Sequence, residues 1–204
     1  RPRNLENTSV LAVPKQENAV NNSFYCSRRP RNFVNNNVFG HQNLGNLVNH
    51  SVFAIPEQEN LNQIHSQFYK NPNQFSEGAI LVIGSGSSGS QIAQELMLSG
   101  KKVFLSIGPH NRPPRRYRGK DNVWWFGALG VWQKKTPDPN TQHVTIAVSG
   151  YEGGKTIDFR KFANLGMNLV GMTKNFKEGK LLFENDLKIN LDNGDKNYLS
   201  VLDQ

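Results

Sequence analysis

AILVIGSGSSG, residues 79–89, decides the expected fold of this chain. Its five leading apolar residues predict a buried strand, and the helical spacing of Ile92, Ala93, Leu96 and Met97 predicts a helix that packs on the sheet. A strand, a Gly-rich turn and a helix in this order form the context in which the GxGxxG pattern binds a dinucleotide. The sequence therefore predicts a nucleotide-binding α/β unit.

Each glycine of the turn has a separate physical task. Gly84 permits the tight turn out of the strand, Gly86 lets the backbone approach a pyrophosphate, and Gly89 lets the helix pack closely on the sheet. The helix N-terminus then presents free N–H groups to the phosphates. Three serines of the turn complete the candidate cofactor-binding set: Ser85, Ser87 and Ser88. Of these, Ser87 and Ser88 can add hydroxyl donors. The alternative is a glycine-rich turn without a ligand.

The end of the next expected strand, 103–107, favours NADP over NAD. An NAD site usually carries an acidic residue about 20 positions past the first glycine. Residues 105–108 contain no Asp or Glu, and Arg112, Arg115 and Arg116 follow them. Guanidinium groups attract the 2′-phosphate of NADP, and Ser106 can donate a hydrogen bond to it. A solvated basic loop or a contact to another domain are the alternatives for these arginines.

Charge and composition restrict the remaining function classes. The 204 residues carry a net charge of +8, which is compatible with nucleic-acid binding through 28–31 and 112–118, with Tyr117 and Trp124 for stacking. No zinc-finger spacing or RNA-binding signature supports that weaker hypothesis, so nucleic acid is not an expected partner. The single Cys26 excludes an intramolecular disulfide and a cysteine metal cluster.

Targeting signals are not visible in the sequence. No apolar run is long enough to span a membrane, and the N-terminus has no signal-peptide pattern, so a cytoplasmic location is expected. The sequence starts with Arg1 rather than Met, which suggests a fragment or a processed product.

Two parts of the chain differ in composition. Residues 1–60 are Asn-rich and contain a local duplication, in which 9–18 (SVLAVPKQEN) resembles 51–60 (SVFAIPEQEN). Such polar sequence buries little apolar area, so we expect an irregular segment. Residues 61–204 predict a Rossmann-like, three-layer domain with a parallel sheet. Further elements are expected as a helix of packed aromatic residues near 124–130, strands at 143–148, 166–173 and 179–184, and helices at 158–165 and 186–202.

From His65 onward the chain resembles flavin-containing monooxygenases and the related cation-diffusion-facilitator-associated putative flavoprotein oxidoreductases. The resemblance lies in several motifs that occur in order: 65–72 (HSQFYKNP), 79–89, 103–108, 113–119 (PPRRYRG), 124–125 (WW), 153–160 (GGKTIDFR) and 195–199.

The resemblance implies an NADPH domain inserted into an FAD domain, with NADPH passing a hydride to FAD for oxygen activation or substrate reduction. It places Gly84, Gly86 and Gly89 in the NADPH domain. His65 and Tyr69 keep the His-x-x-x-Tyr end of the monooxygenase signature, although Glu59 and Leu61 stand where Phe and Gly are usual.

The FAD fingerprint itself is absent, because no GxGxxG precedes residue 84. FAD is therefore implied by the resemblance alone, and catalytic residues and the small-molecule substrate stay unassigned. His65, His110 and His143 are isolated in the sequence and predict no catalytic constellation. A non-catalytic NADP-binding module or an inactive fragment without flavin is the alternative function, and an oligomer is compatible with either.

Overall fold

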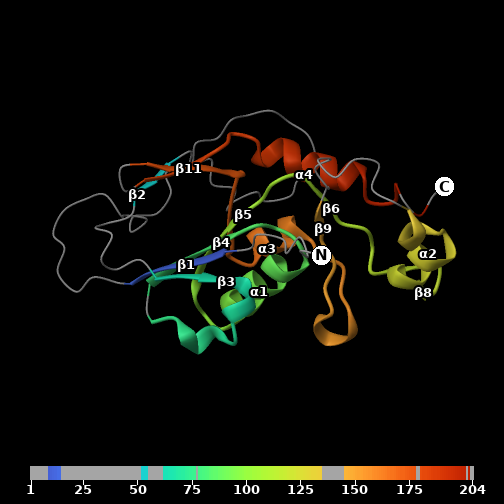
Figure 1. Cartoon of the computed structure of the whole chain (residues 1–204), viewed down its shortest axis with the longest axis horizontal. Helices are drawn as coiled ribbons and strands as arrows, with labels where there is room; N and C mark the ends of the chain where they lie inside the picture. The colour runs from blue at the N-terminus through green and yellow to red at the C-terminus, as the bar shows by residue number, and fades with distance from the viewer. Residues whose placement is uncertain are drawn as a thin grey trace.

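The computed structural model describes residues 9–14, 52–54, 62–76, 78–134, 145–177, 180–200 and 202. Its centre is a five-stranded sheet in the order β10-β5-β4-β1-β3 (Figure 1). These strands are β10 (Asn168–Val170), β5 (Lys102–Ser106), β4 (Gly78–Ile83), β1 (Ser9–Pro14) and β3 (Asn62–His65). β10, β5 and β4 are parallel, whereas β1 is antiparallel to both of its neighbours. The sheet is thus mixed, with a parallel three-stranded half.

Helices α1 (Ser87–Leu98) and α3 (Phe159–Asn164) lie on one side of this sheet, whereas α4 (Leu187–Lys196) lies near the end of β5 on the other side (Figure 1). Residues of all three helices share one hydrophobic core with β4, β5 and β10. As the sequence predicts, Ile92, Ala93 and Leu96 of α1 are buried and Met97 packs against the same core. The mixed α/β class is therefore confirmed.

The side opposite α1 and α3 also carries a second sheet. It has the order β11-β12-β2, from β11 (Thr173–Lys177), β12 (Lys180–Phe183) and β2 (Val52–Ala54). Leu181 and Phe183 of β12 pack on Leu81, Phe104 and Val170 of the main sheet. The main sheet lies between α1 and α3 on one side and the small sheet on the other, with α4 on the side of the small sheet (Figure 1).

Two strands that the sequence did not predict come from the duplicated segment. β1 lies within the first copy and joins the main sheet between β3 and β4, while β2 lies within the second copy and pairs with β12. The rest of the segment 1–60, for which an irregular structure is expected, lies outside the described residues. Cys26 and residues 28–31 belong to that part.

The remaining elements extend from one end of the sheets. β6 (His110–Asn111) runs parallel to β9 (Thr145–Ile146), and β7 (Arg116–Tyr117) pairs antiparallel with β8 (Lys120–Asp121). α2 (Asn122–Ala128) and a 3₁₀ turn, η4 (Val131–Gln133), follow β8. We call residues 116–134 the aromatic arm, and it lies at the end of the molecule away from the main sheet (Figure 1).

Several predicted boundaries differ from the observed ones. The last helix ends at Lys196, not at 202, and successive turns follow it through residue 200. The strand expected over 143–148 is reduced to β9, and His143 lies outside the described residues. Among the described residues, no helix is both long and apolar enough to cross a bilayer.

Candidate functional site

The Gly-rich turn leads from β4 into α1 and leaves amide groups without helical partners. Gly84 has φ +101°, a conformation that side-chain-bearing residues rarely adopt, and its N–H bonds the Ser106 carbonyl at 3.3 Å. Gly86 caps α1 in an extended conformation without a side-chain bond, and the first intrahelical bond runs from Ser90 N–H to Gly86 C=O at 2.9 Å. The N–H groups at 87–89 therefore precede the helical ladder, as an anion site requires.

The serines of the turn divide into structural and accessible ones. Ser85 is buried, and its carbonyl accepts a bond from Ser90 Oγ at 2.9 Å. Ser87 Oγ donates to the Ile146 carbonyl at 3.1 Å and accepts from Val148 N–H at 3.2 Å. Ser88 is exposed. Of the two predicted hydroxyl donors, Ser88 is the one that faces solvent, whereas Ser87 fastens the 146–148 segment to α1.

Arg115 ties the predicted arginine loop to this same segment. Its Nη1 donates to the Ser149 carbonyl at 3.3 Å, its backbone N–H donates to Thr156 Oγ1 at 2.9 Å, and its Nε lies 2.8 Å from Asp121 Oδ2. The structure thus links Arg115 to the Gly-rich turn through residues 146–149. Arg116 follows on β7 with an exposed side chain that makes no ion pair with a described residue.

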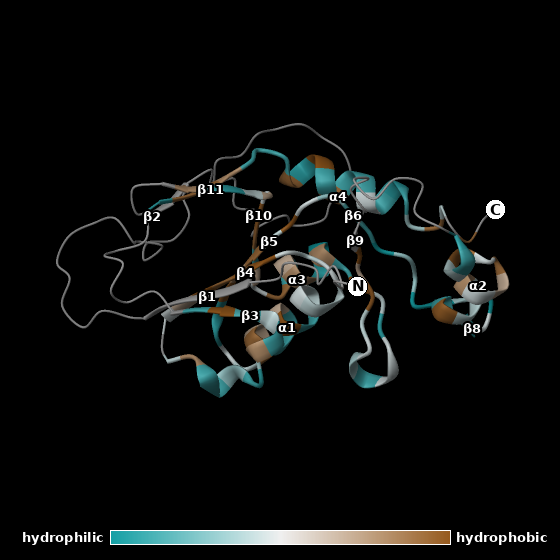
Figure 2. Cartoon of the chain, in the orientation of Figure 1, coloured by the Kyte–Doolittle hydropathy of each residue, from teal (hydrophilic) through white to brown (hydrophobic). Residues whose placement is uncertain are grey.

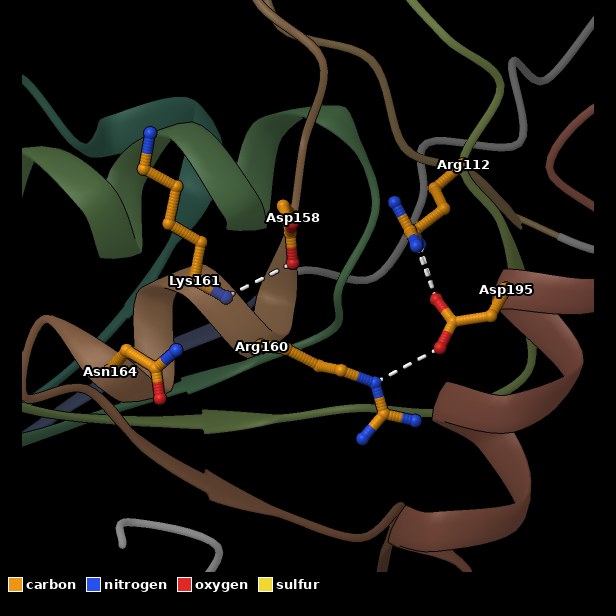
Figure 3. A pocket seen from close by; sticks show the side chains of 6 residues that line it. All are labelled: Arg112, Asp158, Arg160, Lys161, Asn164 and Asp195. Atoms are coloured by element: carbon orange, nitrogen blue, oxygen red, sulfur yellow. Dashed lines mark hydrogen bonds and ion pairs between the residues drawn. The ribbon is translucent and has the colours of Figure 1, made fainter. Parts of the chain in front are cut away.

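Ser106 and Arg112 lie elsewhere. Ser106 is buried, donates to the Gly171 carbonyl at 2.9 Å and accepts from Thr173 N–H at 3.1 Å, so it joins β5 to the start of β11. Arg112 points into a cavity of about 510 Å³ between α3, α4 and the chain after β6 (Figure 3). Their hydrogen-bond partners differ from those of Arg115, although Arg112 Nη1 donates to the Ile157 carbonyl at 3.4 Å, next to Thr156, which Arg115 contacts.

The cavity is built around one carboxylate between two guanidinium groups. Arg112 Nε donates to Asp195 Oδ1 at 3.0 Å, and Arg160 Nε donates to Oδ2 at 2.9 Å (Figure 3). Arg160 also donates to Asp192 Oδ1 at 2.7 Å. Asp158, Lys161 and Asn164 complete the lining on the α3 side.

This arrangement changes the acidity of Asp195. Burial alone would raise the pKa of Asp195, but the bonds from Arg112 and Arg160 outweigh burial and hold it below the usual range. A carboxyl whose pKa is lowered by folding stabilises the protein above its ordinary pKa, and this contribution disappears as pH falls through the lowered value.

The variant Asp195→Asn tests this contribution. We expect it to lower the free energy of unfolding at pH 7 by about 1–2 kcal/mol. This is less than for a fully buried ion pair, because the ion pairs of Asp195 with Arg112 and Arg160 are partly exposed. The loss should shrink as pH falls below roughly 4. Urea unfolding of both proteins at several pH values measures it, with Asn193→Ala on the exposed side of α4 as control. A loss that is constant with pH would contradict the assignment.

The signature residues His65 and Tyr69 have structural partners. His65 Nδ1 accepts from Gln67 N–H at 3.2 Å at the start of η2 (Ser66–Phe68), and Tyr69 Oη donates to Glu95 Oε2 on α1 at 3.0 Å. Burial and Glu95 raise the pKa of Tyr69, so the hydroxyl stays protonated. The Tyr69 bond joins the connector to α1, whereas the His65 contact lies within the connector itself.

His110 is buried at the start of β6. Its Nδ1 lies 3.0 Å from the Gly108 carbonyl, its ring meets Phe159 edge-on with centroids 4.8 Å apart, and its Nε2 has no partner among the described residues. Burial lowers the pKa of His110 and favours the neutral ring. The described residues contain no group of side chains arranged to hold a metal ion.

Comparisons with known proteins identify the segment that carries the turn. Residues 37–110 match the family model "Flavin-binding monooxygenase-like". The resemblance to flavin-containing monooxygenases is confirmed. The monooxygenase-like segment contains β3, β4, α1 and β5, and therefore the whole Gly-rich turn.

Curated relatives cover the same part of the chain. An uncharacterized CzcO-like oxidoreductase of Geobacillus kaustophilus is 42% identical over 74 residues, which are 36% of this chain and 21% of the relative. CzcO of Bacillus subtilis is 39% identical over 82 residues, with the same two shares. Flavin-containing monooxygenase 5 of Oryctolagus cuniculus is 39% identical over 60 residues, 24% of this chain and 11% of the relative. The chain thus spans about a fifth, or less, of these relatives. No solved structure matches it significantly.

The sequence does not predict two pairings near the candidate site. Arg160 and Asp195 fall within motifs of the resemblance, yet nothing in their spacing places Asp195 between Arg160 and Arg112. The contact between Ser149 and Arg115 joins positions 34 residues apart. The first pairing depends on how α3 and α4 pack and the second on where the chain runs after β9, so only the fold reveals them.

Proposed function

We propose that this chain carries the NADPH-binding part of a flavin-dependent oxidoreductase. The single observation that carries the proposal is the Gly-rich turn at the N-terminus of α1, where the N–H groups of 87–89 precede the helical ladder. It lies within the segment that matches flavin-binding monooxygenases. The strand order β10-β5-β4 supports the proposal, since it matches the first half of a dinucleotide-binding sheet.

In this proposal the pyrophosphate of NADPH binds the N-terminus of α1. Gly86 leaves the approach open, the amides at 87–89 donate, and the exposed Ser88 hydroxyl adds a donor. The partial positive charge of the helix N-terminus stabilises the bound anion. The residues present at the turn therefore fit a dinucleotide phosphate.

Arg116 is the residue that we assign to the 2′-phosphate. Arg115 and Arg112 are held by Asp121 and Asp195, whereas the Arg116 side chain is exposed and makes no ion pair with a described residue. Arg115 positions the loop, because it bonds both Ser149 and Thr156.

The chemistry itself belongs to the cofactors. NADPH supplies a hydride, and FAD, which the relatives' family uses, receives it. This chain's own contribution is to bind the nucleotide and to hold its position. An oligomer and a cytoplasmic location remain predictions, and no substrate is assigned.

The variant Arg116→Ala tests the 2′-phosphate assignment. We expect NADPH affinity to fall roughly tenfold, because a charge-assisted bond to phosphate is lost, while NADH affinity changes less than about twofold. Arg118→Ala is the matched control, since Arg118 is an equally exposed arginine that stacks on Tyr117 at 5.0 Å. Fluorescence titration with both nucleotides measures the change. Equal losses for NADPH and NADH would overturn the assignment.

A second function, an NADP-binding module without turnover, is favoured by one observation. The GxGxxG fingerprint occurs once in the 204 residues, whereas an NADPH- and FAD-dependent enzyme needs a site for each nucleotide. Absorbance near the flavin band separates the two functions: NADPH binding without flavin supports the module, and stoichiometric flavin supports the oxidoreductase.

A further inference from the structure

The aromatic arm exposes an apolar helix face to solvent. In α2 the buried positions are Asn122 and Phe126, and Trp125 is turned inward, where its Nε1 donates to the Tyr117 carbonyl at 2.7 Å. The exposed positions of α2 carry no polar side chain: Val123 (47% exposed), Trp124 (52% exposed), Gly127 and Ala128. The solvent-facing side of a surface helix is normally polar, so this face is the reverse of the usual pattern.

Trp132 enlarges the same face. It is 59% exposed and meets Phe126 edge-on with centroids 5.6 Å apart. A Cβ on Gly127 would lie 3.6 Å from the Trp132 ring, so this indole lies directly beside the exposed side of α2. The sequence predicts that these rings pack against the sheet or a neighbouring domain; among the described residues, Trp124 and Trp132 instead contact other rings of the arm and are more than half exposed. Figure 2 shows hydrophobic residues in this outlying part of the molecule.

The arm that carries the apolar face is also rich in basic side chains. The arm contains one acidic residue, Asp121, and its carboxylate is engaged by Arg115. Its four basic residues are all exposed: Arg116, Arg118, Lys120 and Lys134. The Lys120 ammonium lies 5.5 Å from the centroid of the Trp124 ring, so charge and apolar surface are adjacent.

We propose that the tip of the aromatic arm docks peripherally on an anionic lipid surface. Tryptophan prefers the membrane–water interface, where its ring is buried among the headgroups and its N–H stays hydrated. Cationic side chains beside such rings gain from the negative potential of acidic lipids. The positive arm and an anionic bilayer are complementary in charge, and a bilayer accepts the convex outer side of a helix without a preformed groove.

Other occupants fit these contacts less well. A second copy would bring the same four cations against one another, which opposes a symmetric contact through this face. Stacking of nucleic-acid bases needs free ring faces, but Trp124 carries Lys120 near its ring and meets Trp125 edge-on at 4.9 Å.

Sedimentation of the full chain with vesicles tests this proposal. The probes are vesicles of phosphatidylcholine alone and vesicles with about one third phosphatidylserine, at low and at raised salt. Each basic residue near an anionic surface contributes roughly fivefold to partitioning, so we expect the four basic residues of the arm together to strengthen binding to the anionic vesicles roughly 600-fold at low salt. We expect Lys120→Glu with Lys134→Glu to reduce this binding at least 20-fold, by the same relation.

A second pair of variants separates the apolar contribution from charge. Trp124→Ser with Trp132→Ser should abolish the blue shift of tryptophan fluorescence on vesicles, whereas Leu98→Ser, at a 59% exposed position of α1, should leave binding unchanged. Lys180→Glu with Lys196→Glu is the charge-matched control outside the arm. The proposal would be overturned if the chain bound both vesicle types equally or if the arm variants bound as tightly as the parent. Preferential binding of single-stranded nucleic acid, or self-association through the arm, would overturn it as well. The arm variants leave the Gly-rich turn and Arg116 unaltered, but Lys120 pairs with Tyr117 beside Arg116, so NADPH affinity is measured for each arm variant alongside vesicle binding.

Discussion

Replacement of Gly171 by alanine is expected to lower the free energy of unfolding by roughly 3 kcal/mol. Gly171 is buried between β10 and β11, and a Cβ there would lie 2.1 Å from the Glu184 carbonyl oxygen and 2.5 Å from Asp186 Oδ1. Both atoms are fixed, because Glu184 N–H bonds the Met172 carbonyl at 2.8 Å and Asp186 Oδ1 accepts from Met172 N–H at 2.9 Å. The added methyl group must therefore displace backbone.

Gly108 offers a matched control for this substitution. A Cβ on Gly108 would lie 3.6 Å from the Met172 side chain, an ordinary van der Waals distance. We expect Gly108→Ala to change stability by less than about 1 kcal/mol. Urea unfolding followed by tryptophan fluorescence compares the two variants. Equal stability of Gly171→Ala and the parent would contradict the close packing between β10, β12 and the start of α4.

Replacement of Gly194 by alanine is expected to lower the free energy of unfolding by about 2 kcal/mol, although alanine has the higher helix propensity. Alanine in a helix interior is worth about 1 kcal/mol more than glycine. At Gly194, however, a Cβ would lie 2.4 Å from His110 Nε2, and the His110 ring is held by Phe159 and the Gly108 carbonyl. The clash with a confined ring outweighs the gain in propensity.

A double-mutant cycle isolates this contact. In the His110→Ala background the ring is removed, so Gly194→Ala should become neutral or stabilising by up to about 1 kcal/mol. The coupling between the two sites is then about 2–3 kcal/mol, measured by the same unfolding experiment. Additive effects would show that α4 does not press against His110.

The elements that the sequence predicts best are those with local signals. β4, the Gly-rich turn, α1 and β5 follow from apolar periodicity and glycine spacing. Gly100, at φ +83°, closes α1, with Lys101 N–H bonded to the Leu96 carbonyl at 3.1 Å. The antiparallel β1 was not predicted, because its six residues gain their partners from β3 and β4, more than 45 positions away. Sequence periodicity contains no information about such distant pairing.

In the candidate site, too, some residues are predicted by local sequence and others depend on tertiary packing. The turn residues 84–89 lie together because they are consecutive, so the sequence predicts them as a set. The positions of the arginines depend on packing and do not follow from the sequence. Arg112 bonds Asp195 in the cavity, Arg115 bonds Ser149, and Arg116 is exposed. Helix propensity disfavours Gly194 inside α4, and the structure explains the glycine by the approach of His110. Local rules predict propensity, but only tertiary contact decides where a side chain is used.

A fluorescence titration of the intact chain with NADPH and with NADH tests the central claim most directly, with absorbance near the flavin band recorded beforehand. We predict saturable binding of both nucleotides, with NADPH bound roughly tenfold more tightly because of the 2′-phosphate. If the Gly86→Val variant no longer binds, the nucleotide binds at the turn into α1, because a side chain there blocks the approach of the pyrophosphate. Absence of binding by either nucleotide would contradict the proposal that this turn holds NADPH.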